Sequence, residues 1–134
     1  ASFAFLFTRV GLAGADMGAA YLLPRIVGLG RATELLLLGD DLDADRALEL
    51  GLATDVVPDE ELAAACDALA RRLADGPALA YSTTKLLLTR ELDLDLAGAL
   101  ELEALGQALM MQSEDHREFH AAWAEGRRPD WSGR

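Results

Sequence analysis

The sequence predicts an α/β fold in which helices dominate and only one or two short strands occur. The chain has 134 residues, of which 51 % are apolar and 26 % charged, the balance of one folded domain. Apolar residues recur at helical spacing along most of it, as at Leu62, Cys66, Leu69 and Leu73. Only Ser2–Phe7 and the brief segment Ala53–Val57 are typical of strands.

The first segments surround a loop of small residues. Ser2–Phe7 is aromatic and apolar, which predicts a buried strand. Gly11–Gly18 contains three glycines, so it predicts a loop that turns tightly or approaches a ligand closely. Asp16 stands at the N-cap position of a helix expected over Met17–Leu23, and Pro24 is expected to end or kink that helix.

The remainder is predicted to be helical apart from Ala53–Val57. Glycine, proline or a capping residue bounds most of these helices, and Asp43 and Ser113 are expected to act as N-caps. They are expected at Arg31–Leu38, Asp43–Leu50, Asp59–Ala74, Ala78–Leu92, Leu96–Gln112 and Glu114–Glu125. Two strands cannot form a self-sufficient sheet, so the first strand is expected to need partners outside the chain. The chain also lacks an initiator methionine, and we expect it to be the back part of a longer protein.

Charge and cysteine content exclude several classes of function. With 12 basic and 23 acidic residues the net charge is −11, which argues against a nucleic-acid partner. One cysteine, Cys66, cannot form an intramolecular disulfide framework. The sequence contains neither a recognisable signal peptide nor an apolar run of membrane-spanning length. We therefore expect a cytoplasmic protein with no membrane partner.

Asp16 is the strongest candidate for a catalytic residue. A lone carboxylate in a Gly/Ala loop at a helix start can act as a catalytic acid or base, tuned by burial and the helix dipole. The alternative is a structural N-cap, since aspartate is among the favoured capping residues. The residues alone favour the cap.

Two further groups offer weaker hypotheses. His116 and His120 lie four residues apart on a predicted helix, as metal ligands can, but no third ligand is evident and we expect no metal site. Arg127, Arg128 and Trp131, with Trp123 nearby, form the only basic and aromatic cluster. Such a cluster suits a phosphorylated ligand that bears a ring. The alternative is a solvated tail.

Four segments together resemble the crotonase superfamily of enoyl-CoA hydratases and isomerases. The first runs from the Gly11–Gly18 loop through Leu22-Leu23-Pro24-Arg25-Ile26-Val27-Gly28. The others are Ala32–Gly39, Ala44–Val57 and the tail Trp123–Trp131. They occur in the family's order and at roughly its spacing, and they cover essentially the whole chain.

The resemblance implies the C-terminal, helix-rich portion of a crotonase-like α/β fold, with the spiral β-core mostly missing. Residues 1–57 would be the end of that core with the active-site loop. Residues 58–134 would be a helical region for CoA binding and oligomerisation. The resemblance also places the family's oxyanion hole and first catalytic carboxylate outside the chain.

The resemblance assigns site residues as well. The family's Pro-Glu pair is replaced by Leu6-Phe7, which argues against hydration by two glutamates, and Asp16 becomes the catalytic acid/base. Substrate-binding residues would be Gly14, Ala15, Met17 and Gly18. CoA-binding residues would be Trp123, Arg127, Arg128 and Trp131.

The implied function is hydration or double-bond isomerisation of an acyl-CoA thioester through an enolate, in fatty-acid or related acyl-CoA metabolism. CoA belongs to the substrate, so neither a separate cofactor nor a metal is expected. A homotrimer or dimer of trimers is implied, and the chain alone is expected to be inactive. The alternative is a non-catalytic binding or assembly module derived from the same family.

Overall fold

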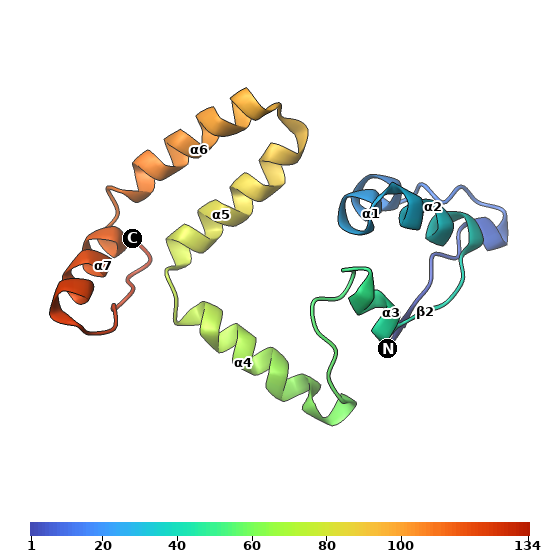
Figure 1. Cartoon of the computed structure of the whole chain (residues 1–134), viewed down its shortest axis with the longest axis horizontal. Helices are drawn as coiled ribbons and strands as arrows, with labels where there is room; N and C mark the ends of the chain where they lie inside the picture. The colour runs from blue at the N-terminus through green and yellow to red at the C-terminus, as the bar shows by residue number, and fades with distance from the viewer. The chain divides into compact units, whose positions relative to one another are not determined.

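The computed structural model describes residues 1–134 and divides them into two compact units, residues 1–61 and 62–134 (Figure 1). The family resemblance placed a boundary after residue 57. The first unit contains β1 (Ser2–Phe3), η1 (Thr8–Val10), α1 (Ala19–Val27), α2 (Leu29–Leu38), β2 (Leu42–Asp43), α3 (Ala44–Glu49) and η2 (Asp59–Glu61).

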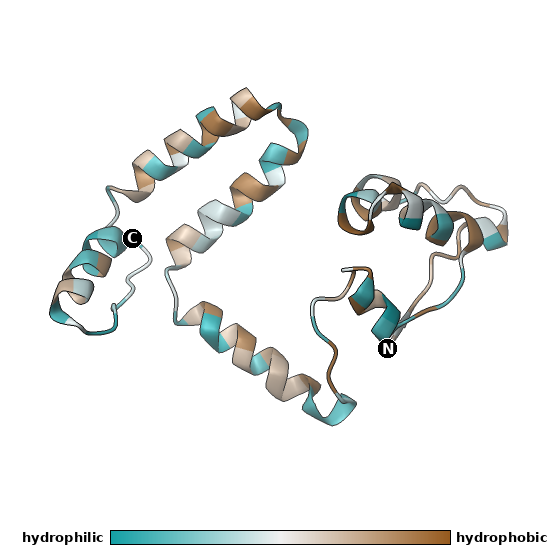
Figure 2. Ribbon diagram, viewed as in Figure 1, coloured by the Kyte–Doolittle hydropathy of each residue, from teal (hydrophilic) through white to brown (hydrophobic).

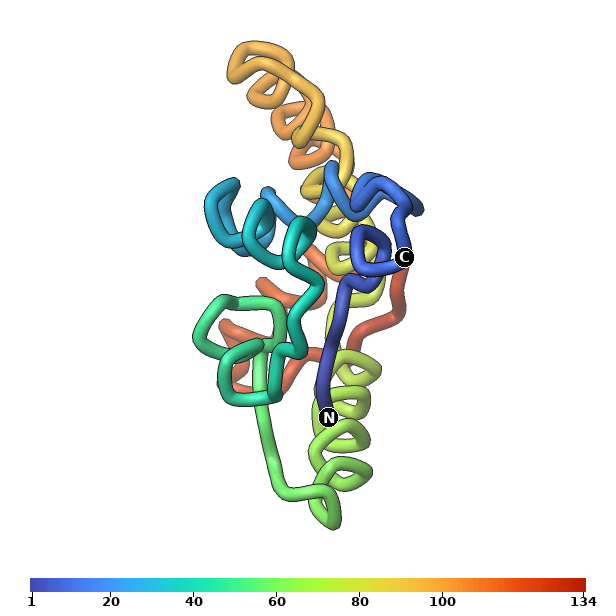
Figure 3. Tube along the Cα trace, turned by 90° about the vertical axis from the view of Figure 1, so that its right-hand side faces the viewer, coloured from blue at the N-terminus to red at the C-terminus, as the bar shows by residue number.

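The second unit is entirely helical. It contains α4 (Leu62–Ala74), α5 (Ala78–Arg90), η3 (Glu91–Asp93), α6 (Leu96–Met110) and α7 (Glu114–Glu125). Helices α5 and α6 form an antiparallel hairpin, drawn in yellow and orange in Figure 3. The predicted helix-rich α/β class is therefore confirmed.

The sheet differs from the prediction in its second strand. Strand β1 pairs antiparallel with β2, with Ser2 opposite Asp43 and Phe3 opposite Leu42. The segment Ala53–Val57 forms no strand. The predicted buried strand Ser2–Phe7 is reduced to Ser2–Phe3, whose two residues are exposed, and it has one partner strand inside the chain, where none was expected.

Helix α1 begins two residues later than predicted and continues through Pro24. Its N-cap is Gly18, whose φ of +83° is left-handed and therefore suits a residue without a Cβ atom. Pro24 does not end the helix, because the next turn closes through the Gly28 N–H, which donates to the Pro24 carbonyl at 3.0 Å. The predicted end of α2 at Gly39 is confirmed.

Two predicted caps are confirmed by hydrogen bonds. The Asp43 carboxylate accepts from the Arg46 N–H at 2.8 Å and begins α3. The Ser113 hydroxyl oxygen accepts from the His116 N–H at 3.0 Å and begins α7. These side chains satisfy backbone donors that the first helical turn leaves free.

Few apolar side chains are buried. The buried ones are Leu23, Ala32, Leu42 and Ala47 in the first unit and Ala122 in the second. The apolar face predicted for α4 is exposed, with Leu62 and Leu73 more than half accessible and Cys66 also exposed. No other element packs extensively on α4, and so that face stays uncovered.

Hydrophobic residues also lie along α5 and α6, in brown in Figure 2. Exposed leucines on these two helices include Leu86, Leu88, Leu100, Leu105 and Leu109. No helix is both long and apolar enough to cross a membrane.

Candidate functional site

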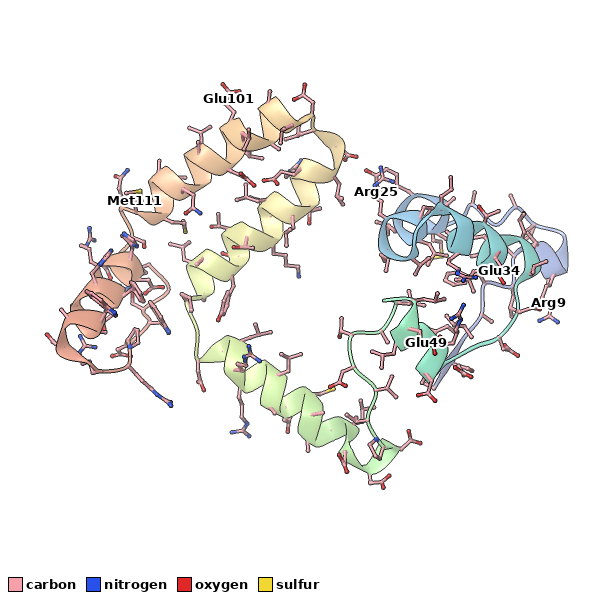
Figure 4. All side chains as sticks on the ribbon, in the orientation of Figure 1. Arg9, Arg25, Glu34, Glu49, Glu101 and Met111 are labelled. Atoms are coloured by element: carbon pink, nitrogen blue, oxygen red, sulfur yellow. The ribbon has the colours of Figure 1, made fainter.

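The loop that carries Asp16 is anchored to the C-terminal end of α2. The Thr8 hydroxyl donates to the carbonyls of Leu36 at 3.2 Å and Leu37 at 2.9 Å. The Arg9 guanidinium donates to the Gly39 carbonyl at 3.2 Å, and Figure 4 labels Arg9 at this end of the helix. Carbonyls at a helix C-terminus lack partners within the helix, so these bonds fix the loop by satisfying them.

The same loop touches α2 a second time at Gly14. A Cβ atom built on Gly14 would lie 2.8 Å from the Leu36 carbonyl oxygen and 3.3 Å from the Leu36 Cβ. Only a residue without a side chain permits this approach. The family resemblance assigned Gly14 to substrate binding, and the structure shows Gly14 packed against α2.

Asp16 lies two residues beyond that contact, and its side chain is exposed. The carboxylate does not cap α1, contrary to the sequence-based expectation. It accepts instead from the adjacent Met17 N–H at 2.8 Å, while the Asp16 carbonyl accepts from the Ala19 N–H at 2.9 Å. The turn displaces the helix start to Gly18, and the carboxylate of Asp16 is left without a capping role.

Met17 has an unusual backbone conformation. Its φ is +50°, the only positive value at a non-glycine residue in residues 1–134, and its side chain is 90 % exposed. Left-handed conformations at such residues are costly and tend to occur at functional sites. Two consecutive left-handed residues, Met17 and Gly18, turn the chain sharply directly after Asp16.

Gly14 and Ala15 also line an apolar cavity of about 290 Å³ between this loop, α1 and α2. Of the predicted substrate-binding residues, these two line the cavity. Met17 and Gly18 do not line it and belong to the exposed turn beside Asp16.

The predicted CoA-binding residues lie in the second unit, where the tail after α7 folds back along that helix. Asp115, only 5 % exposed, accepts from the Ser132 N–H at 2.7 Å and the Gly133 N–H at 3.1 Å. The Asp115 N–H donates to the Arg134 carbonyl at 3.1 Å. Figure 1 accordingly places the C-terminus beside the first turn of α7.

A second carboxylate holds the tail one turn further along α7. Glu118 accepts two hydrogen bonds from the Arg127 guanidinium, at 2.5 and 3.1 Å, and one from the Asp130 N–H at 2.8 Å. These bonds, those from Arg127 first, lower the pKa of Glu118 from an ordinary value of 4.5 to about 2. The carboxylates of Glu118 and Glu125 raise the pKa of Arg127.

These contacts separate the four tail candidates. Arg127 is held by Glu118 and Glu125, whereas the exposed guanidinium of Arg128 makes no ion pair or hydrogen bond. Trp123 is 76 % exposed. Trp131 is half-buried and lines a cavity of about 300 Å³ between α5, α6 and α7.

The histidine pair lies on α7. The rings of His116 and His120 meet edge to face, with centroids 4.7 Å apart. No group of three or more histidine, cysteine or carboxylate side chains in residues 1–134 is placed to hold a metal ion.

Comparisons with known proteins agree on one family. The sequence profile of the enoyl-CoA hydratase/isomerase family matches residues 1–134. The chain is 37 % identical over 134 residues to the 1,2-epoxyphenylacetyl-CoA isomerase of Escherichia coli K12, covering 51 % of that protein. It is 34 % identical over 131 residues to the trans-2-decenoyl-[acyl-carrier-protein] isomerase of Streptococcus mutans, covering 48 %. The chain thus spans about half the length of the curated relatives it matches.

Solved structures give the same result. A Streptomyces coelicolor A3(2) protein assigned as an enoyl-CoA hydratase superposes with a TM-score of 0.96 and 60 % identity. That match covers 99 % of this chain and 48 % of the other. Enoyl-CoA hydratase from Mycobacterium tuberculosis H37Rv superposes with a TM-score of 0.93 at 30 % identity, over 100 % and 53 % of the two chains.

Proposed function

Because the chain belongs to the enoyl-CoA hydratase/isomerase family, we propose that the protein carrying it shifts the double bond of an enoyl-CoA thioester, with Asp16 as acid and base. The observation that carries this proposal is the Asp16 carboxylate itself. It is exposed, it caps no helix, and it sits on a loop anchored to α2 by Thr8 and Gly14.

Isomerisation is favoured over hydration by the neighbouring residues. By the family resemblance, Phe7 occupies the position at which hydratases carry a catalytic glutamate. A phenyl ring cannot exchange protons. Hydration needs a group that activates water, whereas a double-bond shift returns the proton to the same substrate, so one carboxylate suffices. One relative that is named as an isomerase of an enoyl thioester, the trans-2-decenoyl-[acyl-carrier-protein] isomerase, supports this choice.

In the proposed reaction Asp16 takes a proton from a carbon of the acyl chain beside the double bond. The electron pair moves through the conjugated system onto the thioester oxygen and forms an enolate. Asp16 then returns the proton to the carbon two positions away, and the double bond forms between the other pair of carbons. Nothing is added or lost. The enolate oxygen requires hydrogen-bond donors, which the family resemblance places outside residues 1–134.

We assign the CoA portion of the substrate to the tail. Arg128 has the free guanidinium that a phosphate group requires, and exposed Trp123 offers a ring face for stacking. Arg127 and Trp131 would act less directly, because Arg127 is engaged by two glutamates and Trp131 faces a cavity.

The test incubates the native protein that carries this chain with a 3-enoyl-CoA in ordinary aqueous buffer. The proposal expects conversion to the conjugated 2-enoyl thioester, seen by ultraviolet absorbance, without gain of a water molecule in the product mass. A product heavier by one water would replace isomerisation by hydration. No turnover with either double-bond isomer would reject the enzyme proposal.

A second candidate is a non-catalytic binding or assembly module. The broad exposure of leucines on α5 and α6 favours it, because exposed apolar patches commonly mark protein interfaces. Both candidates are compatible with a cytoplasmic protein that forms a homotrimer or dimer of trimers. Sedimentation of the native protein would test the oligomeric state. Turnover distinguishes the two candidates, because the assembly module would convert no substrate.

A further inference from the structure

The Arg127 guanidinium joins the end of α7 to the tail that follows it. It donates to the two Glu118 oxygens at 2.5 and 3.1 Å and to Glu125 at 2.5 Å. It also donates to the main-chain carbonyl of Arg128 at 3.2 Å. A planar guanidinium carries five N–H donors in a rigid fork and can span all these acceptors, whereas an ammonium group is a single point of charge.

The backbone around Arg128 is fixed on both sides. The Arg128 carbonyl accepts from Arg127, and Pro129 follows, which restricts the preceding residue to extended backbone. The next residue is held as well, because the Asp130 N–H donates to Glu118 at 2.8 Å. The Arg128 guanidinium, which makes no ion pair or hydrogen bond, therefore stands on an ordered backbone.

An ordered backbone matters for binding because a segment that must be immobilised when the ligand arrives reduces the affinity. A guanidinium with unoccupied donors is suited to a phosphate group, since it can form two parallel charge-assisted hydrogen bonds with it. Arg128 has both properties, and the first of them depends on its neighbour Arg127.

We propose that Arg127 is a positioning residue, which fixes the backbone of Arg128 so that the free Arg128 guanidinium meets a phosphate group of CoA. This inference rests on the proposed function, because it takes a CoA thioester as the ligand and Arg128 as its phosphate contact. Only Arg128 then touches the phosphate, and Arg127 acts through it.

A purely electrostatic role for Arg127 makes the opposite prediction. Glu118 and Glu125 place two negative charges beside Arg127, and negative charge opposes the binding of a phosphate. If charge alone mattered, removing the Glu118 charge would strengthen CoA binding. If position matters, removing it weakens CoA binding, because Glu118 holds both Arg127 and the Asp130 N–H.

The test measures the Kd of butanoyl-CoA by titration calorimetry with the native protein that carries this chain. Arg127→Lys keeps the positive charge but loses the fork, and it is expected to weaken Kd about threefold or more. Glu118→Gln is expected to weaken Kd by about the same factor, although it removes a negative charge. Arg46→Lys is the control, because Arg46 also pairs with a glutamate and its side chain is 43 % accessible, against 42 % for Arg127. Its Kd should match the wild type.

A double-mutant cycle shows whether Arg127 acts through Arg128. Arg128→Ala alone is expected to weaken Kd about tenfold or more. Arg127→Lys added to Arg128→Ala should then change Kd by no more than about twofold. Losses that multiply in the double variant would mean that Arg127 contacts the ligand itself, and would overturn the proposal. Tighter binding in Glu118→Gln would also overturn it.

Turnover separates this inference from the proposed function. Arg127→Lys is expected to raise KM for the enoyl-CoA and leave kcat unchanged, a split that partial unfolding would not produce. Isomerisation with a Kd that Arg127→Lys does not alter would reject the positioning role and leave the isomerase proposal intact. The expected changes in Kd, in a protein without turnover, would support the positioning role and reject the catalysis.

Discussion

Gly14 and Leu36 are in direct backbone contact, so close that a Cβ atom on Gly14 would lie 2.8 Å from the Leu36 carbonyl oxygen. This contact ties the loop of Asp16 to α2. With the bonds from Thr8 and Arg9 to the same end of the helix, it determines where the carboxylate stands.

Gly14→Ala is therefore expected to displace the loop. The new methyl group meets backbone, which cannot rotate away, and overpacking of this kind costs about 1–3 kcal/mol. Thermal unfolding of the native protein measures the loss. Gly30→Ala is the control, since nothing lies within 4 Å of its Cβ position and it stands inside α2, where alanine is preferred. Equal stability of the two variants would contradict the account of Gly14.

Thr8→Val tests the hydroxyl that reaches α2. Valine keeps the shape of threonine but leaves the carbonyls of Leu36 and Leu37 without this donor, and a net loss of about 1 kcal/mol is expected. Chemical denaturation measures it. In the control, Thr89→Val, the lost hydroxyl bonds the Lys85 carbonyl on the exposed side of a helix, and a change within about 0.5 kcal/mol is expected.

Asp115→Asn tests the anchoring of the C-terminal tail. The amide oxygen of asparagine can still accept from Ser132 and Gly133, but it carries no negative charge and the second acceptor oxygen is gone, so the bonds lose their charge-assisted strength. Hydrogen exchange at the Ser132 and Gly133 amides should accelerate by about tenfold or more. Asp67→Asn is the control, because it makes the same change at an exposed residue of α4. Unchanged exchange in Asp115→Asn would show that the tail is held elsewhere.

Glu118 makes the attachment of the C-terminal tail pH-dependent, so that the attachment weakens at low pH. Its pKa is lowered from 4.5 to about 2, chiefly by the hydrogen bonds from Arg127, so the folded state holds the ionised form. The stabilisation is complete above pH 4.5 and is lost as the pH falls towards 2. The protection factor of the Asp130 amide, its exchange relative to the intrinsic rate at the same pH, should fall over that window, and less steeply at high salt. In Glu118→Gln this fall should be absent, and its persistence would assign the effect to another group.

Helices were predictable from local signals, and the sheet was not. Caps such as Asp43 and Ser113 act within one turn, so spacing alone identifies them. Strand β2 consists of Leu42 and Asp43 only, too few residues for an alternating pattern, and its pairing with Ser2–Phe3 depends on the path of the chain between them. The apolar face of α4 was predictable from periodicity, but its exposure was not, because periodicity does not show whether another element covers a face.

The candidate site was predictable in part. Asp16 stood out by residue type, but its capping role was wrong, because the left-handed turn at Met17 and Gly18 is not evident from residue spacing. The anchors Thr8 and Arg9 act on residues about thirty positions away, and no short motif signals such bonds. The pairing of Arg127 with Glu118 likewise arises only when the tail folds back on α7.

The most direct measurement compares Asp16→Asn with the wild-type native protein in enoyl-CoA isomerisation and in CoA binding. Asparagine keeps the size of the side chain and can still accept from the Met17 N–H, but it cannot take up the substrate proton. The account predicts a fall in kcat of at least about a hundredfold, with the Kd for an acyl-CoA unchanged. Turnover by Asp16→Asn at the wild-type rate would contradict the central role given to this carboxylate.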